Sequence, residues 1–425
     1  MSQTNVLVFV AGAALSIGSQ ALAQNANLDQ SRAYANELVA DAGNRASLLQ
    51  GGAGGSATYA GTFSIADGSG NNRLNMGGTE IFRYNASFRD KSTQGDQNDT
   101  TIGFNAPVNR LRFWGNVWDK NLTFKIQGNW GGGSAEGQSF NLEDAFAMYT
   151  WDNGFALKWG QFKLPIIREV NVEDEFQLGA DRSVASYVFS QGYSQGVQMV
   201  YQADAFRFAG GFSDGVNSGN TDFNSGAEAD YAFNARLDWK VMGADWERFN
   251  DYTSWRSAPD NALLVGGAFE WQTGGNTGFT ADVDTWLYTV DASWEGQGWN
   301  VSAAGYGSHI DPAGGTTLDN YGAMLQGGIF VADQVELFGR YDGIFADKDA
   351  GLPQATMHFL TAGVNYYVSP ESHACKLTGQ FGYAFNDTSA LFGSGGLIEG
   401  NTRNAFLGDS KKGEWTVIGQ VQVVW

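Results

Sequence analysis

Cysteine, histidine and proline are all scarce in this chain of 425 residues. Cysteine occurs once, as Cys375, histidine three times, as His309, His358 and His373, and proline six times. A single cysteine excludes an internal disulfide and a cysteine-rich zinc site. Because the histidines are far apart and show no H-x-x-x-H spacing, we expect neither a metal site nor a cofactor.

Charged residues, and basic residues above all, are also few. They make up 16% of the chain, against about 25% in an ordinary soluble domain. Lys and Arg together number 25 against 45 Asp and Glu, which gives a formal net charge of −20. Because binding to a phosphate backbone needs an excess of positive charge, this balance excludes nucleic acid as a partner.

Long hydrophobic runs are missing too, since no stretch approaches the ~20 apolar residues of a membrane-spanning helix. Residues 6–16 are largely apolar and are followed by Ala21-Leu22-Ala23, a small-x-small cleavage pattern. This predicts a signal peptide over residues 1–23, although Met1–Asn5 lack the usual Lys or Arg. An exported chain without a helical anchor belongs in the periplasm, outside the cell, or in the outer membrane as a β-barrel.

The segment after the signal peptide differs from the rest of the chain. Within residues 24–50, apolar residues recur at steps of three and four, which predicts an amphipathic N-terminal helix. They are Tyr34, Leu38, Ala42, Ala46 and Leu49. We interpret this helix as a tether or a plug segment, residues 51–79 as a Gly/Ser-rich linker, and residues 80–425 as one barrel domain.

What the chain has in quantity is glycine, with 58 residues, and aromatic residues, which make up 14%. From residue 80 onward the apolar residues alternate with a period of two. In residues 415–425, for example, Trp415, Val417 and Val421 face one way and Thr416 and Gln420 the other. Apolar-out and polar-in alternation is typical of a strand between lipid and a wet lumen. Sixteen such segments are predicted, near 80–89, 105–118, 122–131, 141–151, 155–164, 195–202, 205–213, 231–240, 262–271, 283–294, 299–308, 320–331, 335–345, 356–368, 375–386 and 414–425.

The connections between these segments alternate between short and long. This rhythm is typical of the turns and loops of an outer-membrane barrel, and the one exception is residues 241–261, a long connection where a short one is due. The long loop at 165–194 carries apolar residues such as Val170, Val184 and Phe189, which would be buried if the loop folded inward. We therefore predict an all-β fold, a 16-stranded antiparallel transmembrane β-barrel narrowed by this loop.

Basic residues predominate at the alternate strand positions whose side chains are expected to face the lumen. With those of the 165–194 loop, the candidate pore-lining and anion-binding residues are Arg83, Arg110, Arg112, Lys125, Lys158, Arg168, Arg182, Arg207, Arg236 and Arg340. The same parity places Asp238, Asp291, Glu336 and Asp342 inside. A positive wall attracts small anions, but arginines facing acids across the lumen would give a transverse field without strong selectivity. Both interpretations stay open.

Several short motifs carry a family resemblance. The run Leu157–Pro165, followed by the long loop, resembles the G-Q-F-K-x-P run of the phosphate-selective porin O and P family, and Asn141–Phe146, Ser194–Gln198 and Phe212–Gly215 continue it. The resemblance implies a sixteen-stranded barrel, a homotrimer, an inward-folded third loop and passive passage of anions or phosphate. One departure is that only Arg168 and Arg182 occur in the loop, outnumbered by acids, which counts against strong phosphate selectivity.

Three kinds of function are considered for a chain with these features. The favoured one is an outer-membrane porin, a passive diffusion channel for small hydrophilic solutes with a possible preference for anions or phosphate. The chain is not expected to be an enzyme, since His358 has no nucleophile placed beside it by the sequence. A non-channel structural or adhesive surface protein is the alternative. The expected partners are small hydrophilic or anionic solutes, outer-membrane lipid and two further copies of the chain.

Overall fold

The structure is a computed structural model. It describes residues 56–59, 62–90, 100–130, 140–223, 225–226, 228–243, 245–258, 260–274, 282–370, 372–389, 391, 404–408 and 413–425. The predicted signal peptide and the predicted helix over 24–50 lie outside these residues. In the described part of the chain, no helix is long and apolar enough to cross a membrane.

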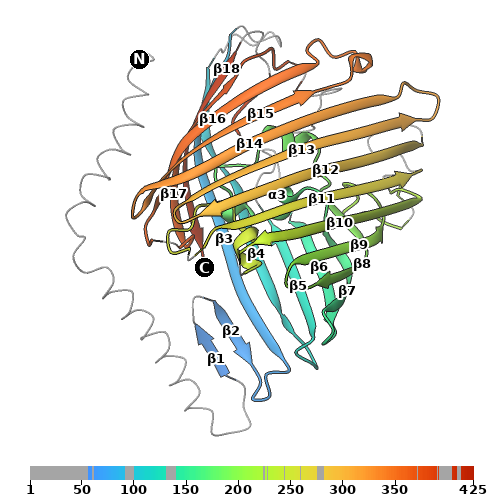
Figure 1. Ribbon diagram of the computed structural model, residues 1–425, viewed down its shortest axis with the longest axis vertical. Coiled ribbons are helices and arrows are strands. Elements are labelled where there is room, and N and C mark those ends of the chain that lie inside the picture. The colour runs from blue at the N-terminus through green and yellow to red at the C-terminus, as the bar shows by residue number, and fades with distance from the viewer. Residues whose placement is uncertain are drawn as a thin grey trace.

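Sixteen antiparallel strands, β3 to β18, form a closed barrel (Figure 1). Each strand pairs with the next in the chain, and the last pairs with the first, with Gly419 opposite Tyr84. The strands are β3 (Arg73–Phe88), β4 (Thr100–Asn116), β5 (Leu122–Asn129), β6 (Asn141–Thr150), β7 (Phe155–Lys163), β8 (Tyr193–Gln202), β9 (Phe206–Ser213), β10 (Tyr231–Met242), β11 (Ala262–Thr273), β12 (Val283–Gly296), β13 (Trp299–Pro312), β14 (Leu318–Ala332), β15 (Val335–Phe345), β16 (Thr356–Tyr367), β17 (Cys375–Ala384) and β18 (Glu414–Val424). The predicted fold and strand number are confirmed.

The barrel begins earlier than the sequence pattern indicated. Strand β3 starts at Arg73 rather than near residue 80, and its first residues pair with β2 (Phe63–Ala66), which in turn pairs with β1 (Ser56–Tyr59). Part of the segment expected as a linker therefore forms a small hairpin that extends the sheet. Gly77 and Gly78 interrupt the apolar alternation, which hid this start of the strand from sequence analysis.

The outer face of the barrel is apolar and the inner face is polar. Val290 and Leu325 are exposed on the outside, whereas their chain neighbours Asp291 and Gln326 are buried inside. This arrangement inverts that of a soluble protein, as expected for strands whose outer face meets lipid. The polar interior is consequently covered by the protein's own connections rather than by a second layer of sheet.

The short and the long connections lie at opposite rims of the barrel. One rim, here the turn end, holds the residues between β4 and β5, β6 and β7, β8 and β9, β12 and β13, β14 and β15, and β16 and β17, together with Trp425. The other rim, the loop end, holds the longer connections. Residues 243–261, between β10 and β11, are the long connection at the turn end, so the irregularity seen in the sequence is present in the fold.

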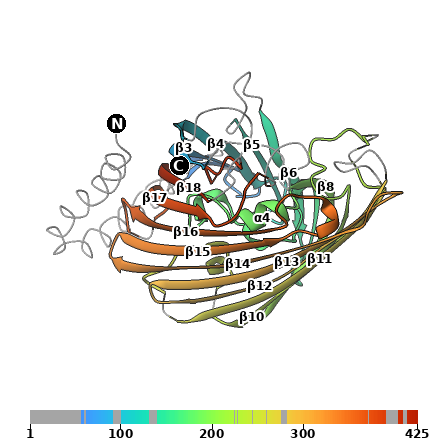
Figure 2. The same cartoon turned by 90° about the horizontal axis from the view of Figure 1, so that it is seen from above.

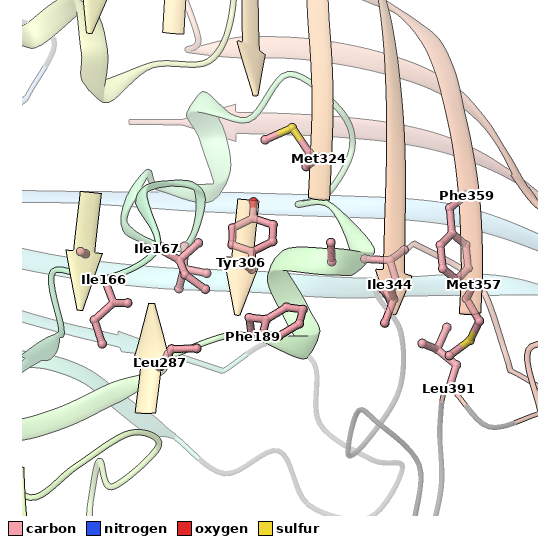
Figure 3. Packing of buried hydrophobic residues seen from close by; sticks show 14 of the residues in the cluster. Ile166, Ile167, Phe189, Leu287, Tyr306, Met324, Ile344, Met357, Phe359 and Leu391 are labelled. Atoms are coloured by element: carbon pink, nitrogen blue, oxygen red, sulfur yellow. The ribbon is translucent and has the colours of Figure 1, made fainter. Parts of the chain in front are cut away.

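The connection between β7 and β8, residues 164–192, lies inside the barrel. It contains α3 (Arg168–Asn171), a short 3-10 turn η1 (Asp174–Phe176) and α4 (Val184–Val188), and Figure 2 shows α4 within the ring of strands. Its apolar residues pack on inward-facing residues of the wall, and Figure 3 shows Ile167 and Phe189 beside Tyr306 and Leu287. This apolar cluster is the largest buried core of the described chain.

Glycine is required at the seam where the chain's end closes the barrel. Gly78 exchanges backbone hydrogen bonds with Trp425, at 2.7 and 3.0 Å between nitrogen and oxygen, and a Cβ at Gly78 would lie 2.7 Å from the Trp425 ring and 2.8 Å from the Arg110 carbonyl. We expect Gly78→Ala to lower the free energy of unfolding by about 1–3 kcal/mol, the usual effect of overpacking. Urea titration of tryptophan fluorescence in detergent would measure it.

The matched control for this substitution is Gly419→Ala. A Cβ at Gly419 would have nothing within 4 Å, and fewer backbone conformations in the unfolded chain stabilise by about 0.4–1 kcal/mol where the fold tolerates alanine. Equal effects of the two substitutions would contradict the close approach of Trp425 to Gly78.

Candidate functional site

Arg110 on β4 is the centre of a buried network of ion pairs that ties the 164–192 loop to the wall. Its Nε and Nη2 donate to the two carboxylate oxygens of Glu143 at 2.6 and 3.1 Å, and Nη2 also donates to Asp174 of η1 at 2.8 Å. Asp174 in turn pairs with Arg182 of the loop. Such bidentate, charge-assisted hydrogen bonds are among the strongest that side chains form.

Glu173 of the same loop pairs with three cations on strands β4, β5 and β7. Its carboxylate lies 3.0 Å from Lys125 Nζ, 3.6 Å from Lys163 Nζ and 3.5 Å from Arg110 Nη1. Burial raises the pKa of the Glu173 carboxyl, but these cations outweigh burial and hold its pKa well below its usual range. Glu173 is therefore ionised at neutral pH.

The second half of the loop is joined to other strands of the wall. Asp181 pairs with Arg83 on β3 at 3.2 Å, and the Asp181 carbonyl accepts from Arg340 Nη1 on β15 at 2.7 Å. Lys376 on β17 donates to the carbonyls of Glu175 and Gln177 at 3.1 and 2.9 Å. The loop leaves the wall at β7, and its helix α4 packs on β14 and β15, so the loop crosses the interior.

A third group of predicted residues lies on β9 and β10. Asp238 lies 3.2 Å from Arg207 Nη2 and 2.6 Å from Arg236 Nη2, and Arg236 also pairs with Asp291 at 2.9 Å. The alternation of the strands places all four side chains inside the barrel. What the parity could not indicate is that each guanidinium would already have a carboxylate partner.

Arg168 and Lys158 differ from the other predicted basic residues, because no carboxylate lies within 4.0 Å of either among the described residues. Lys158 Nζ sits over the rings of Phe146 and Phe162, at 4.3 and 4.0 Å from the centroids. Arg168 donates from Nε and Nη2 to the carbonyl of Phe249 at 3.1 and 2.6 Å, and from Nη1 to Ser293.

The net positive wall expected from the sequence is largely cancelled. Eight of the ten candidate residues have a carboxylate within 4.0 Å, namely Arg83, Arg110, Arg112, Lys125, Arg182, Arg207, Arg236 and Arg340. The alternation of the strands did not indicate two sources of these carboxylates. The loop acids turn onto the wall, and a β-bulge opposite Gln127 and Gly128 turns both Glu143 and Asp144 inward, although they are consecutive.

Water reaches the ionisable interior on one side of the barrel. The side chains of Lys125, Glu173 and Arg207 are 23%, 21% and 27% exposed, whereas those of Arg83 and Arg340 are 2% exposed. A cavity of about 400 Å³ lies on this side, between the loop and strands β8 to β10. Its lining includes Arg168, Glu173, Arg207, Ala209, Arg236, Asp238, Phe249 and Asn250.

The connection over residues 243–261 forms part of this cavity, a role that sequence analysis did not predict. It contains a short 3-10 turn, η2 (Glu247–Asn250), and its Phe249 and Tyr252 are almost fully buried. The only signal in the sequence was its unusual length at the turn end. Phe249, Asn250 and Tyr252 thus join the candidate site.

The histidines stay apart in the fold. His358 forms a hydrogen bond of 2.7 Å with the Tyr341 hydroxyl. His309 lies 2.8 Å from the Asp319 carboxylate, and His373 lies 3.0 Å from the Thr253 hydroxyl. Among the described residues no group of three or more His, Cys, Asp or Glu is placed to hold a metal ion.

Comparisons with known proteins agree on the fold. No family model matches the chain, and no curated protein sequence matches it. Solved structures do, and they include an anion-selective porin from Comamonas acidovorans (TM-score 0.58, 13% identity, 83% of this chain and 99% of that one). Others are OmpF of Salmonella typhi in complex with daunomycin (0.56, 12%, 87% and 100%) and the outer-membrane channel DcaP of Acinetobacter baumannii (0.53, 10%, 84% and 99%). At these identities the likeness establishes a porin-type barrel fold.

Proposed function

We propose that the chain is an outer-membrane porin, a passive diffusion channel for small hydrophilic solutes. The observation that carries the proposal is the closed barrel with an apolar outer face and a water-exposed cleft inside, beside Lys125, Glu173 and Arg207. The similar structures, whose names include an anion-selective porin and an outer-membrane channel, support it. Because the loop fills much of the remaining interior, it would act as the constriction that limits solute size.

The mechanism needs no covalent chemistry. A hydrated solute would enter the cleft, exchange part of its water for the paired charges and amides along the wall, and leave at the other rim. Three arginines of the cavity, Arg168, Arg207 and Arg236, face Glu173 and Asp238, and Arg168 has no carboxylate within 4.0 Å among the described residues. We therefore propose a modest anion preference. Strong phosphate selectivity is not expected, because most guanidinium groups are already paired.

Location and assembly form part of the same proposal. The predicted signal peptide would export the chain, and the barrel would insert into the outer membrane. A closed sheet suits lipid, because it leaves no free edge with unpaired backbone groups. Assembly as a homotrimer follows from the resemblance to the porin O and P family. Chemical cross-linking of outer-membrane fractions tests both, with a trimer band expected in that fraction.

The direct test of the function is single-channel recording of the detergent-purified protein in a planar bilayer. We expect stepwise conductance and, under a KCl gradient, a reversal potential that reports a modest preference for chloride over potassium. Added inorganic phosphate should lower the chloride current only weakly. A preference for potassium would contradict the proposed role of Arg168, and the absence of any channel would favour the structural or adhesive alternative.

A further inference from the structure

Residues 243–258, here the turn-end insert, run into the barrel from the rim where the other connections are short. A hairpin between two antiparallel strands needs as few as two connecting residues, so closure of the barrel does not require this length. The described part of the insert buries Phe249, Tyr252, Thr253 and Ser254 inside the barrel. Its length and its burial both call for an explanation beyond joining β10 to β11.

The insert is tied to the wall at three separate places. Trp246 Nε1 donates to the Ala203 carbonyl, between β8 and β9, at 3.0 Å. Arg248 pairs with Glu295 of β12, the neighbour of β11, at 3.3 Å, and farther around the ring the Ser254 amide donates to Glu336 of β15 at 2.7 Å. Because its anchors lie on separate parts of the ring, the insert crosses the lumen rather than lining one wall.

The insert also holds the 164–192 loop. The Tyr252 amide donates to the Phe176 carbonyl at 3.0 Å, and the Phe249 carbonyl accepts two hydrogen bonds from the Arg168 guanidinium. The Arg168 guanidinium also lies 4.6 Å from the centre of the Tyr252 ring. A buried cation needs compensation, and here a backbone carbonyl and an aromatic ring of the insert supply it. Arg168 therefore joins the two segments.

We propose that the turn-end insert is a second fixed constriction of the channel and that Arg168 is the positioning residue that holds it against the loop. This inference rests on the proposed channel function. With the loop, the insert closes the part of the interior that faces β12 to β17, and it directs solutes to the cleft along β8 to β10. Arg168 acts by fixing this geometry, in addition to the charge it contributes to the cleft.

Single-channel recording of Arg168→Gln tests the role of Arg168. Loss of the guanidinium frees the Phe249 carbonyl, so we expect the insert to move and conductance to rise about twofold, because conductance follows the open cross-section. Arg256→Gln is the matched control, since Arg256 is a half-buried arginine of the same insert that pairs with Asp333 at the rim and, among the described residues, makes no contact with the loop. Its conductance should equal that of the wild type.

A disulfide separates positioning from simple loss of charge. Phe176→Cys with Tyr252→Cys, in a Cys375→Ser background, places two thiols where the loop and the insert share a backbone hydrogen bond. Combined with Arg168→Gln, the oxidised protein should return to wild-type conductance, and dithiothreitol should restore the high value. A conductance that stays high after oxidation, in protein shown by mass to be cross-linked, would contradict the positioning role.

Replacement of residues 244–260 by Asn-Gly tests the insert itself. We expect conductance to rise at least as much as in Arg168→Gln, and Arg168→Gln in this background should raise it no further. An unchanged conductance in both variants, or a loss of anion preference without a rise in conductance, would overturn the proposal and leave Arg168 as an anion-binding group only. A silent wild-type protein would instead overturn the channel function, so the two failures are distinguishable.

Discussion

Arg110→Met should lower the free energy of unfolding by about 3–5 kcal/mol, the usual cost of removing one partner of a buried ion pair. Arg110 is almost fully buried and binds Glu143 and Asp174 directly. Its loss leaves these two carboxylates without their shared cation in a site that water barely reaches. Because Asp174 belongs to η1, the loop should also loosen at η1, where among the described residues only the Arg112–Glu175 pair still ties it to β4, and become more open to proteases.

Two measurements check this prediction. Urea titration of tryptophan fluorescence gives the free energy of unfolding, and limited proteolysis reports release of the loop. Arg256→Met is the matched control, since the Arg256–Asp333 pair is at the surface, where ion pairs contribute about 0–1 kcal/mol. If both arginines proved equally dispensable, the network around Arg110 would not be what anchors the loop.

Glu173→Gln should shift the ion selectivity of the channel more than any other single substitution in the cleft. The amide keeps the shape of the side chain but removes the negative charge that Lys125, Lys163 and Arg110 share. The cleft then gains net positive charge. We expect the chloride-to-potassium permeability ratio to rise about fivefold, which corresponds to about 1 kcal/mol, the interaction of two charges at 4 Å in water.

Reversal potentials under a KCl gradient measure this shift. The control is Asp152→Asn, which removes an exposed acid of the turn between β6 and β7 and should leave the ratio unchanged. The variant should remain folded, because Arg110 retains Glu143 and Asp174 and Lys125 retains Asp144. A ratio equal to that of the wild type would mean that permeating ions do not pass Glu173.

The barrel could be predicted from the sequence because its causes are local. A strand between lipid and water alternates with a period of two, and Val290 beside Asp291 is one instance repeated along every wall. The rhythm of short and long connections indicated a barrel with short turns at one rim and long loops at the other. The start of β3 was missed because Gly77 and Gly78 erase the alternation directly after the residues that pair with β2.

The site was less accessible to sequence analysis, because its chemistry depends on which side chains meet across the lumen. Parity placed Arg110 and Arg236 inside but could not indicate Asp174 or Asp291 as their partners. A single bulge turned Glu143 inward, and no pattern in the sequence marks that bulge. The turn-end insert was recognised only as an irregular length, since its burial depends on contacts with the wall and the loop that no sequence pattern marks.

Single cysteines in a Cys375→Ser background locate the path of ions through the barrel. Ala209 lines the cavity beside β8 to β10, whereas Thr378 on β17 is 3% exposed within the filled part of the interior. During single-channel recording, a charged methanethiosulfonate reagent should reduce the current through Ala209→Cys and leave Thr378→Cys unaffected. Block of Thr378→Cys with no effect on Ala209→Cys would contradict the proposed path, because ions would then cross the side that the loop and the insert close.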